Sequence, residues 1–469
     1  MIADELKYRI RSAFGHVPTS EQEASIEAFA QFMTDRTEHA VMVMRGSAGT
    51  GKTTLAAAIV KGMQQLGQKL VLLAPTGRAA KVFSLYAGHP AYTIHRRIYR
   101  QKSLEGGFDL NYNNQHDTLF IIDEASMIAG DGLLDDLIRF VYNGRNCRMM
   151  LIGDGAQLPP VGEEESPALM SEVLRVKGLR VHESRLQEVL RQSSESGILY
   201  NATLIRGMMA GDGGGQRIAL PRIRFQGFPD IKVLPGNELI EELSSSYSHV
   251  GQDETLVITR SNKWANVYNQ GIRGRILDHE SELCSGDRLM VVKNNYFWGQ
   301  GSDAASGERK MDFIANGDLA VVRRVRHVHE LYGFRFAEVT MTFPDYDDSE
   351  LTALTLLDAL TSEAPALTAE QQEALYNKVL EDYADIPLKQ ERMKKLKEDK
   401  YYNALQVKFA YAATCHKAQG GQWAHVYIDQ GYMTDEMLTT DYLHWLYTAF
   451  TRATERLYLV NWPETQTAR

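Results

Sequence analysis

The sequence of 469 residues has little cysteine and no long apolar run. Its cysteines, Cys147, Cys284 and Cys415, are scattered, with no CxxC pair and no neighbouring pair of histidines. This argues against a disulfide framework and a structural zinc site, and it is typical of a reducing cytoplasm. No apolar run reaches the roughly 18 residues of a membrane helix. The charged segment 1–14 excludes a signal peptide and predicts an amphipathic helix. We expect a cytoplasmic protein with no membrane partner.

The chain also lacks an excess of basic residues, since its formal net charge is -9. Segment 345–400 alone contains 14 acidic and 7 basic residues, which leaves the rest of the chain at -2. Because the acidity is concentrated in one segment, the net charge does not exclude a nucleic-acid partner.

Short apolar runs bounded by turn residues predict an α/β fold with buried parallel strands. The first group comprises 40–44, 69–76, 118–126 and 148–154. A second group comprises 254–261, 406–414, 425–429 and 456–462. In open α/β sheets, ligands bind at the carboxyl ends of the strands. Two α/β domains are therefore expected, the second interrupted by a long insertion.

The insertion has a different pattern. "CSGDRLMVVKNNY" and "FIANGDLAVVRRVRHV" alternate apolar and polar residues after Gly-Asp turns, which predicts antiparallel strands of a small barrel. Further on, "TAEQ" at 368–371 has the spacing of a capping box, so the acidic segment is predicted to be helical at least in part.

A glycine-rich loop between the first strand and a helix matches G-x-x-x-x-G-K-[ST]. Backbone N–H groups of such a loop hold phosphate oxygens at a helix N-terminus. Within it, Lys52 would reach the β- and γ-phosphates, and the Thr53 hydroxyl would bind Mg²⁺. The predicted nucleotide-binding residues are Gly46, Ser47, Ala48, Gly49, Thr50, Gly51, Lys52, Thr53 and Thr54. ATP and Mg²⁺ are the expected cofactors.

Acidic and amide side chains follow two other predicted strands. Asp123 and Glu124 end the third run, where one carboxylate would hold Mg²⁺ and its neighbour would polarise the attacking water. Gln157 lies after the fourth run, where it would contact the γ-phosphate. The alternative is a solvated Asp-Glu pair and a surface glutamine in a turn.

Two arginines lie far from the loop in sequence. Arg191 belongs to "RLQEVLRQ" and Arg452 to "LYTAFTRATERLYLV". Phosphoryl transfer is accelerated by a guanidinium group from outside the P-loop domain. Taken alone, each arginine fits a surface ion pair better, and only the combination with the other motifs favours a role at the phosphate.

The ordered motifs "PTSEQ", "GSAGTGKTT", "APTGRAAK", "YTIH", "IIDEAS", "GDGAQLPPVG", "EVLRQ", "TCHKAQG" and "YTAFTRA" run from Gln22 to Arg452. In this order they resemble the motif series of superfamily 1 DNA helicases, most closely the RecD-like and Dda-like branch. The resemblance implies two RecA-like domains, residues 1–98 with 118–190 and residues 191–273 with 406–469. ATP would bind between them, with Gln22 reading adenine and Arg191 and Arg452 reaching in from the second domain.

The resemblance also implies a path for single-stranded DNA across both domains, followed in the 5′-to-3′ direction. Residues 99–117 would form a hairpin wedge at the junction with duplex DNA, with Phe108 and Tyr112 as stacking candidates; the alternative is a surface loop with incidental aromatics. Residues 274–405 match an SH3-like barrel with a helical extension, whose "YFWGQG" at 296–301 either packs in the barrel or stacks bases. The positions that match DNA-contacting motifs are Pro75, Thr76, Arg78, Lys81, Thr93, His95, Thr414, His416 and Lys417.

The sequence departs from the branch at Gln422, where many members have a glutamate, and no cysteine cluster precedes the hairpin region. We expect a monomeric DNA helicase in replication, repair or recombination, acting with or without protein partners. Three alternatives stay open: a subunit of a larger recombination complex, an RNA-preferring translocase, and a nucleotide-dependent binding switch. A P-loop ATPase with no nucleic-acid partner would leave "TCHKAQG" unexplained.

Overall fold

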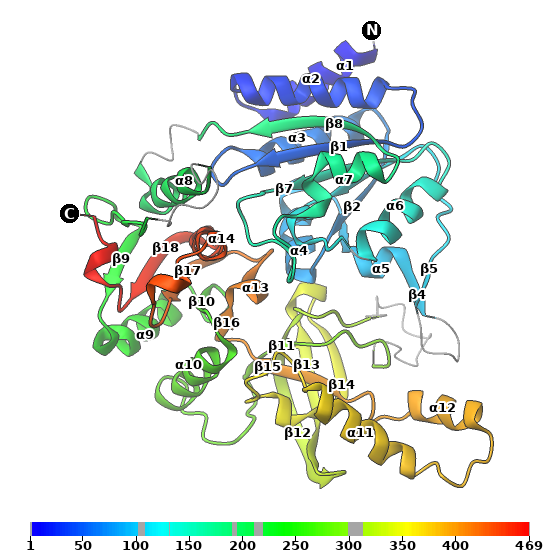
Figure 1. Ribbon diagram of the computed structural model, residues 1–469, viewed down its shortest axis with the longest axis vertical. Helices are drawn as coiled ribbons and strands as arrows, with labels where there is room; N and C mark the ends of the chain where they lie inside the picture. Colours follow the sequence, from blue (N-terminus) through cyan, green and yellow to red (C-terminus); the bar gives the residue numbers. More distant parts are fainter. Residues whose placement is uncertain are drawn as a thin grey trace.

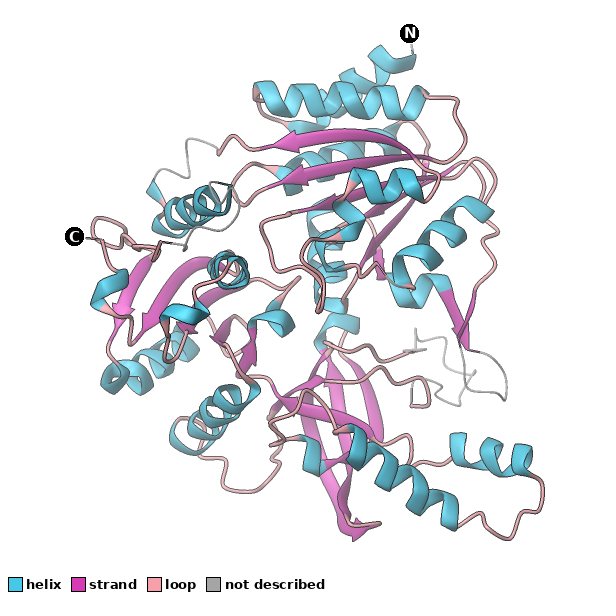
Figure 2. Ribbon diagram, viewed as in Figure 1, coloured by secondary structure: helices cyan, strands magenta, loops and turns pink. Residues whose placement is uncertain are grey.

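The computed structural model describes residues 2–101, 108–130, 132–189, 195–210, 219–298 and 313–468. Two parallel sheets and a closed barrel form its framework, and helices cover both sheets (Figures 1 and 2). This confirms the predicted α/β fold with a barrel inserted in the second α/β unit. Among the described helices, none is both long and apolar enough to cross a lipid bilayer.

The first sheet has six parallel strands in the order β3-β2-β6-β7-β1-β8. Along β1, Met42 and Met44 face one core, and Val41 and Val43 face the other, because helices cover both sides. Its strands are β1 (Ala40–Gly46), β2 (Lys69–Ala74), β3 (Ala91–Thr93), β6 (Thr118–Ile122), β7 (Arg148–Gly153) and β8 (Arg180–Leu186). Its helices are α1 (Ile2–Phe14), α2 (Ser20–Thr34), α3 (Lys52–Gln65), α4 (Gly77–Ala87), α5 (Ile94–Ile98), α6 (Leu133–Asn143) and α7 (Ser171–Val176).

The second sheet has five parallel strands in the order β16-β10-β17-β18-β9. They are β9 (Ile231–Leu234), β10 (Thr255–Thr259), β16 (Ala412–Thr414), β17 (Trp423–Asp429) and β18 (Ala453–Val460). The accompanying helices are α8 (Gly197–Ala210), α9 (Leu239–His249), α10 (Asn262–Arg275), α13 (Cys415–Ala418) and α14 (Thr440–Phe450). Of these helices, α14 contains the start of the last sequence motif and lies between the second sheet and the first unit (Figure 1).

The barrel consists of β11 (Arg288–Val291), β12 (Leu319–Leu331), β13 (Phe334–Phe343), β14 (Ser349–Leu356) and β15 (Leu405–Phe409). The single strand predicted over 406–414 is therefore wrong. Its first half closes the barrel beside β11 and β14, and its second half, β16, joins the second sheet. The sequence pattern does not show the break between β15 and β16, because the residues of both strands are buried, those of β15 in the barrel and those of β16 in the second sheet.

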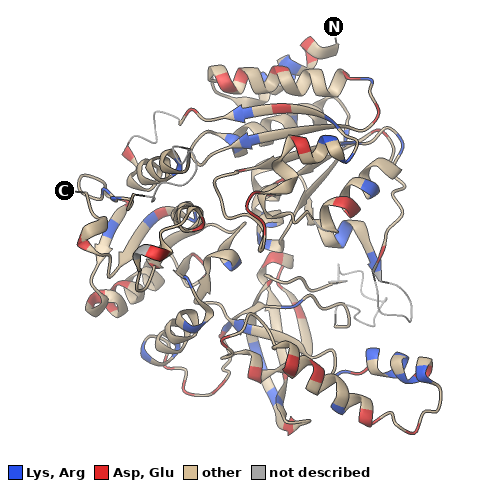
Figure 3. Ribbon diagram, in the orientation of Figure 1, with Lys and Arg blue, Asp and Glu red and all other residues tan. Residues whose placement is uncertain are grey.

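The helical extension contains α11 (Ala369–Glu381) and α12 (Lys389–Lys397). Thr368 forms the predicted capping box with Gln371, so the helix begins where the sequence indicated. Helix α11 carries Glu370, Glu373 and Glu381, whereas lysines gather on α12 (Figure 3). Trp298 packs against the core of the barrel and donates a hydrogen bond from Nε1 to the Asn403 carbonyl at 2.9 Å. For Trp298, this favours packing in the barrel over stacking on bases.

The predicted hairpin region contains two short antiparallel strands, β4 (Tyr99–Gln101) and β5 (Phe108–Leu110). Phe108 pairs with Gln101 in this ladder. The side chain of Tyr112 is exposed. The segment between the two strands lies outside the described residues.

Candidate active site and nucleic-acid interface

The glycine-rich loop connects β1 to α3 with five residues. Gly49 and Gly51 have φ angles of 76° and 75°, in the left-handed region that glycine enters without steric cost. Gly51 caps α3 without a side-chain hydrogen bond, so the first N–H groups of the helix stay available to an anion. The Lys52 ammonium group lies back against the loop and donates to the Gly46 carbonyl at 3.1 Å.

Asp123 and Glu124 follow the buried strand β6. Glu124 has a φ angle of 52°, an uncommon conformation for a residue with a side chain, and its N–H donates to Asp123 Oδ1 at 2.9 Å. Burial, and then the neighbouring Glu124 charge, raises the pKa of Asp123. Among the described residues, no lysine, arginine or histidine forms an ion pair with either carboxylate. Such a half-buried acidic pair fits a divalent cation bound with help from the Thr53 hydroxyl.

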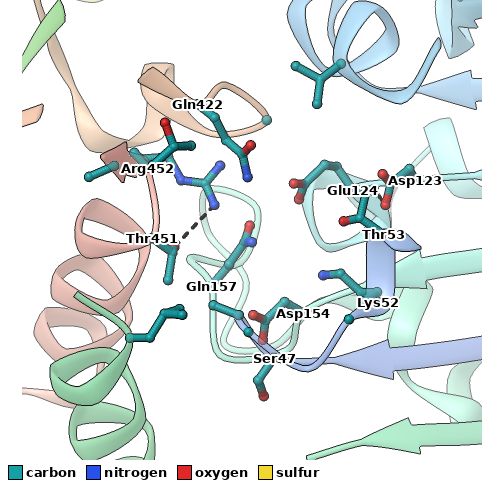
Figure 4. A pocket seen from close by; sticks show the side chains of 18 of the residues that line it. Ser47, Lys52, Thr53, Asp123, Glu124, Asp154, Gln157, Gln422, Thr451 and Arg452 are labelled. Atoms are coloured by element: carbon teal, nitrogen blue, oxygen red, sulfur yellow. Dashed lines mark hydrogen bonds between the residues drawn. The ribbon is translucent and has the colours of Figure 1, made fainter. Parts of the chain in front are cut away.

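Gln157 and Arg452 connect the two sides of the cleft. With its amide in the orientation that satisfies both neighbours, Gln157 donates to Glu124 Oε2 at 3.2 Å and accepts from Arg452 Nη2 at 3.1 Å. Arg452 is 2% exposed and also donates to the Gly421 carbonyl at 3.0 Å. The guanidinium group points into the cleft (Figure 4). A hydrogen-bonded chain therefore runs from a carboxylate of the first unit to an arginine of the second.

These groups line one cavity of about 490 Å³ between the two α/β units (Figure 4). Lys52, Thr53, Asp123, Glu124 and Gln157 line one side. The other side is lined by residues that include Leu199, Gly420, Gln422, Thr451 and Arg452. Gln422, the position of the sequence departure, therefore reaches the cleft as a neutral amide.

Gln22, a predicted nucleotide contact, has other surroundings. Gln22 is 2% exposed beneath the loop, where Nε2 donates to the Thr50 carbonyl at 3.0 Å and Oε1 accepts from Thr19 N–H at 2.9 Å. Gln22 therefore supports the loop from below and is not among the residues that line the cavity. Arg191 lies outside the described residues.

The motif after β2 faces both the barrel and the second sheet. Pro75 and Thr76 precede α4, and Thr76 caps this helix by accepting from Ala79 N–H. Lys81 donates to the Pro344 carbonyl at 2.8 Å and lies 3.4 Å from the Asp345 carboxylate. Arg78 donates to the Gln422 carbonyl at 2.9 Å. Helix α4, which carries two of the predicted nucleic-acid contacts, is thereby joined directly to a residue of the cleft.

The other predicted nucleic-acid contacts also lie near the barrel. Thr93 caps α5, and the His95 ring stacks on Phe313 with ring centroids 6.4 Å apart. Lys81 and Thr93 line a second cavity of about 500 Å³ between α4, α5 and the barrel turn 344–347. Burial lowers the pKa of His95, so its ring stays neutral at physiological pH.

In the second unit, Thr414 is the residue before α13, and His416 and Lys417 lie on that short helix. Lys417 donates to the Pro365 carbonyl at 3.3 Å. The structure therefore brings the predicted contact motifs of both α/β units against the same insertion.

Sequence reasoning missed two residues of the cleft region. The Tyr447 hydroxyl accepts from Ala48 N–H at 2.9 Å and donates to the Asp154 carboxylate at 2.6 Å. Both residues occur in the quoted motifs "YTAFTRA" and "GDGAQLPPVG". Their pairing leaves no local sequence signal, because the two positions are 293 residues apart.

The chain matches known families at both ends. The AAA domain family matches residues 19–214, and the UvrD-like helicase C-terminal domain family matches residues 409–460. A relative, the ATP-dependent RecD2 DNA helicase of Deinococcus radiodurans, is 27% identical over 334 residues, which cover 68% of this chain and 42% of the relative. The conjugal transfer protein TraA of Rhizobium radiobacter is 27% identical over 59% of this chain and 24% of its own length.

The chain thus spans less than half of these two relatives. The uncharacterized protein R530 of Acanthamoeba polyphaga mimivirus is 22% identical, with 93% of this chain and 98% of that protein covered. Among solved structures, a Bacteroides Pif1 helicase in complex with ADP-AlF3 and ssDNA has 16% identity and a TM-score of 0.47, covering 97% of this chain and 95% of that one. The ordered motifs, the two family matches and the RecD2 relative together support a superfamily 1 helicase of the RecD type.

Proposed function

We propose that the chain is an ATP-dependent DNA helicase that translocates along single-stranded DNA and unwinds duplex DNA. The observation that carries this proposal is the hydrogen-bonded chain from Glu124 through Gln157 to Arg452. It unites groups from both α/β units in one cleft. Hydrolysis in such a cleft changes how the two units sit against each other, and that change can do mechanical work.

The residues of the cleft have distinct roles in the proposed hydrolysis. The loop 46–54 binds the phosphates through backbone N–H groups, and Lys52 turns from the Gly46 carbonyl to the γ-phosphate. Thr53 and Asp123 would hold Mg²⁺, which would neutralise charge on the β- and γ-phosphates. Glu124 orients the attacking water and accepts its proton. Gln157 and Arg452 contact the γ-phosphate as charge builds on it, and Arg191 is a second candidate for this role.

The proposed DNA path follows α4, α5 and α13 along the barrel. Thr76, Lys81 and Thr93 contact it in the first unit, and Thr414, His416 and Lys417 in the second. Short polar side chains and backbone groups can position phosphates without a large basic surface, so the acidic net charge is no obstacle. The bond from Arg78 to the Gln422 carbonyl supports communication between this path and the cleft.

Further features of the proposal rest on the family. The 5′-to-3′ direction, the adenine contact of Gln22 and the wedge role of Phe108 follow from the RecD-like resemblance. A role in replication, repair or recombination follows from the same resemblance. We propose that the chain acts as a monomer at junctions of single- and double-stranded DNA.

The decisive experiment measures ATP hydrolysis with and without single-stranded DNA. We expect a strong stimulation by DNA and the loss of turnover in Lys52→Ala. Equal ATP turnover with and without DNA would refute the proposal that hydrolysis drives translocation along DNA. Stronger stimulation by RNA would favour an RNA translocase, and stimulation without unwinding of tailed duplexes would favour a binding switch. Substrates with 5′ or 3′ single-stranded tails test the direction in the same assay.

A further inference from the structure

The turn after β7 belongs to the first unit by sequence, but α14 of the second unit holds it. Asp154 Oδ2 accepts from the Tyr447 hydroxyl at 2.6 Å, and Leu158 N–H donates to Thr448 Oγ1 at 2.7 Å. His444 Nδ1 lies 2.9 Å from the Ala156 carbonyl. Positions 444, 447 and 448 share one face of a helix because of its 3.6-residue period. One helix face therefore binds the whole turn 154–158.

Tyr447 extends this contact to the phosphate-binding loop. Its hydroxyl donates to Asp154 and at the same time accepts from Ala48 N–H at 2.9 Å. The side chain is 1% exposed, and burial raises the pKa of its phenol well above the usual value. The phenol therefore stays protonated at physiological pH and can keep both bonds. A single hydroxyl thus joins the loop of the first unit, the turn with Gln157 and the helix that leads to Arg452.

The turn held by α14 carries Gln157. Gln157 N–H donates to the Asp154 carbonyl at 3.2 Å, and Ala156 N–H donates to Asp154 Oδ1 at 3.0 Å. Arg452 follows the end of α14 and donates from Nε to the Thr448 carbonyl at 3.1 Å. Gln157 and Arg452 are consequently anchored to the same helix, although they come from different α/β units.

We propose that Tyr447 is a positioning residue for ATP hydrolysis, which sets the depth at which Gln157 and Arg452 enter the cleft relative to the phosphate-binding loop. This inference rests on the proposed ATPase function. The loop itself supplies the N–H groups that bind the ground-state phosphates. Loss of the Tyr447 hydroxyl should therefore weaken interactions of the transition state more than binding of ATP.

The test compares Tyr447→Phe with Tyr442→Phe in DNA-stimulated ATP hydrolysis. Tyr442 is a matched control on the same helix, because it is 2% exposed and its hydroxyl also donates to one partner, Gln430 Oε1 at 2.7 Å, and accepts from another, Gln466 Nε2 at 3.3 Å. Both variants should lower Tm to a similar extent. Only Tyr447→Phe should lower kcat, by about 10- to 100-fold, with the KM for ATP changed by less than about threefold.

A second variant, Asp154→Asn, keeps the shape of the turn and weakens the same bond. Combined with Tyr447→Phe, it should add little further loss of kcat, because both changes break one interaction. Similar kcat in the two tyrosine variants, or a loss confined to KM, would overturn the positioning role. A wild-type protein without ATP hydrolysis would instead refute the proposed function, so the two failures are distinguishable.

Discussion

The two α/β units each contain a buried strand followed by a turn and a helix, but the turns differ in length. In the first unit, five residues separate β1 from α3. In the second, only Arg260 and Ser261 separate β10 from α10. Ser261 also caps its own helix, because its hydroxyl accepts from Trp264 N–H at 3.3 Å. The equivalent cap in the first unit is Gly51, which has no side chain.

This difference explains why the two units contribute different groups to the cleft. In the first unit, the long glycine loop has no side-chain cap, so the N–H groups at the start of the helix stay free to bind phosphate. In the second unit, the serine hydroxyl already accepts a hydrogen bond from one of these N–H groups. The second unit therefore contributes side chains to the cleft, Arg452 above all. Three substitutions test this account.

The largest effect is expected for Arg452→Ala, which removes the contribution of the second unit. Hydrolysis of ATP should fall by about 10³-fold or more, because a guanidinium group stabilises the charge that develops on the γ-phosphate. Binding of ADP, which lacks that phosphate, should change by only a few fold. The measurements are single-turnover hydrolysis and titration with a fluorescent ADP. An equal loss of ADP binding would show that Arg452 holds the nucleotide in general.

A smaller effect is expected for Gly51→Ala in the first unit. A left-handed conformation costs a residue with a Cβ about 1–2 kcal/mol, so the loop should shift and hold the phosphates less well. The affinity for ATP should fall by about 5- to 30-fold, measured by equilibrium titration. An unchanged affinity would mean that the left-handed turn is not needed to cradle the phosphates.

The smallest effect on turnover is expected for Ser261→Ala, the matching cap of the second unit. Loss of the cap should lower the free energy of unfolding by about 1 kcal/mol, seen as a decrease in Tm of about 2–4 °C. ATP affinity and kcat should stay at the wild-type values, since this helix end faces no ligand in the proposal. A clear loss of ATP binding would indicate that the second turn also serves the nucleotide.

Much of the fold could be predicted from the sequence. The strands β1, β2, β6 and β7 are continuous apolar runs, and the capping box at Thr368 marks the start of α11. Two strands of the first sheet, β3 and β8, are not predicted by this pattern, because β3 has only three residues and β8, "RVHESRL", is mostly polar at the edge of the sheet. The break between β15 and β16 was also missed, since burial on both sides of the break removes any change in the pattern.

The candidate site was predictable where neighbouring residues define it. Lys52, Asp123 and Glu124 lie at strand ends within recognisable motifs, and the structure places them in one cavity. The partners of Arg78 were not predictable, because its contact with Gln422 spans 344 residues of sequence. The role of Gln22 beneath the loop likewise depends on how α2 packs against the first sheet.

By itself, the sequence determined the local chemistry of this protein. Left-handed glycines, a helix start without a side-chain cap and a carboxylate pair after a buried strand all depend on residues within a few positions of one another. Only the tertiary structure decided which distant groups complete the cleft. Tyr447 and Ala48 are 399 residues apart in the sequence, and packing of α14 against the first unit brings them together. No local sequence pattern predicts a contact between residues so far apart.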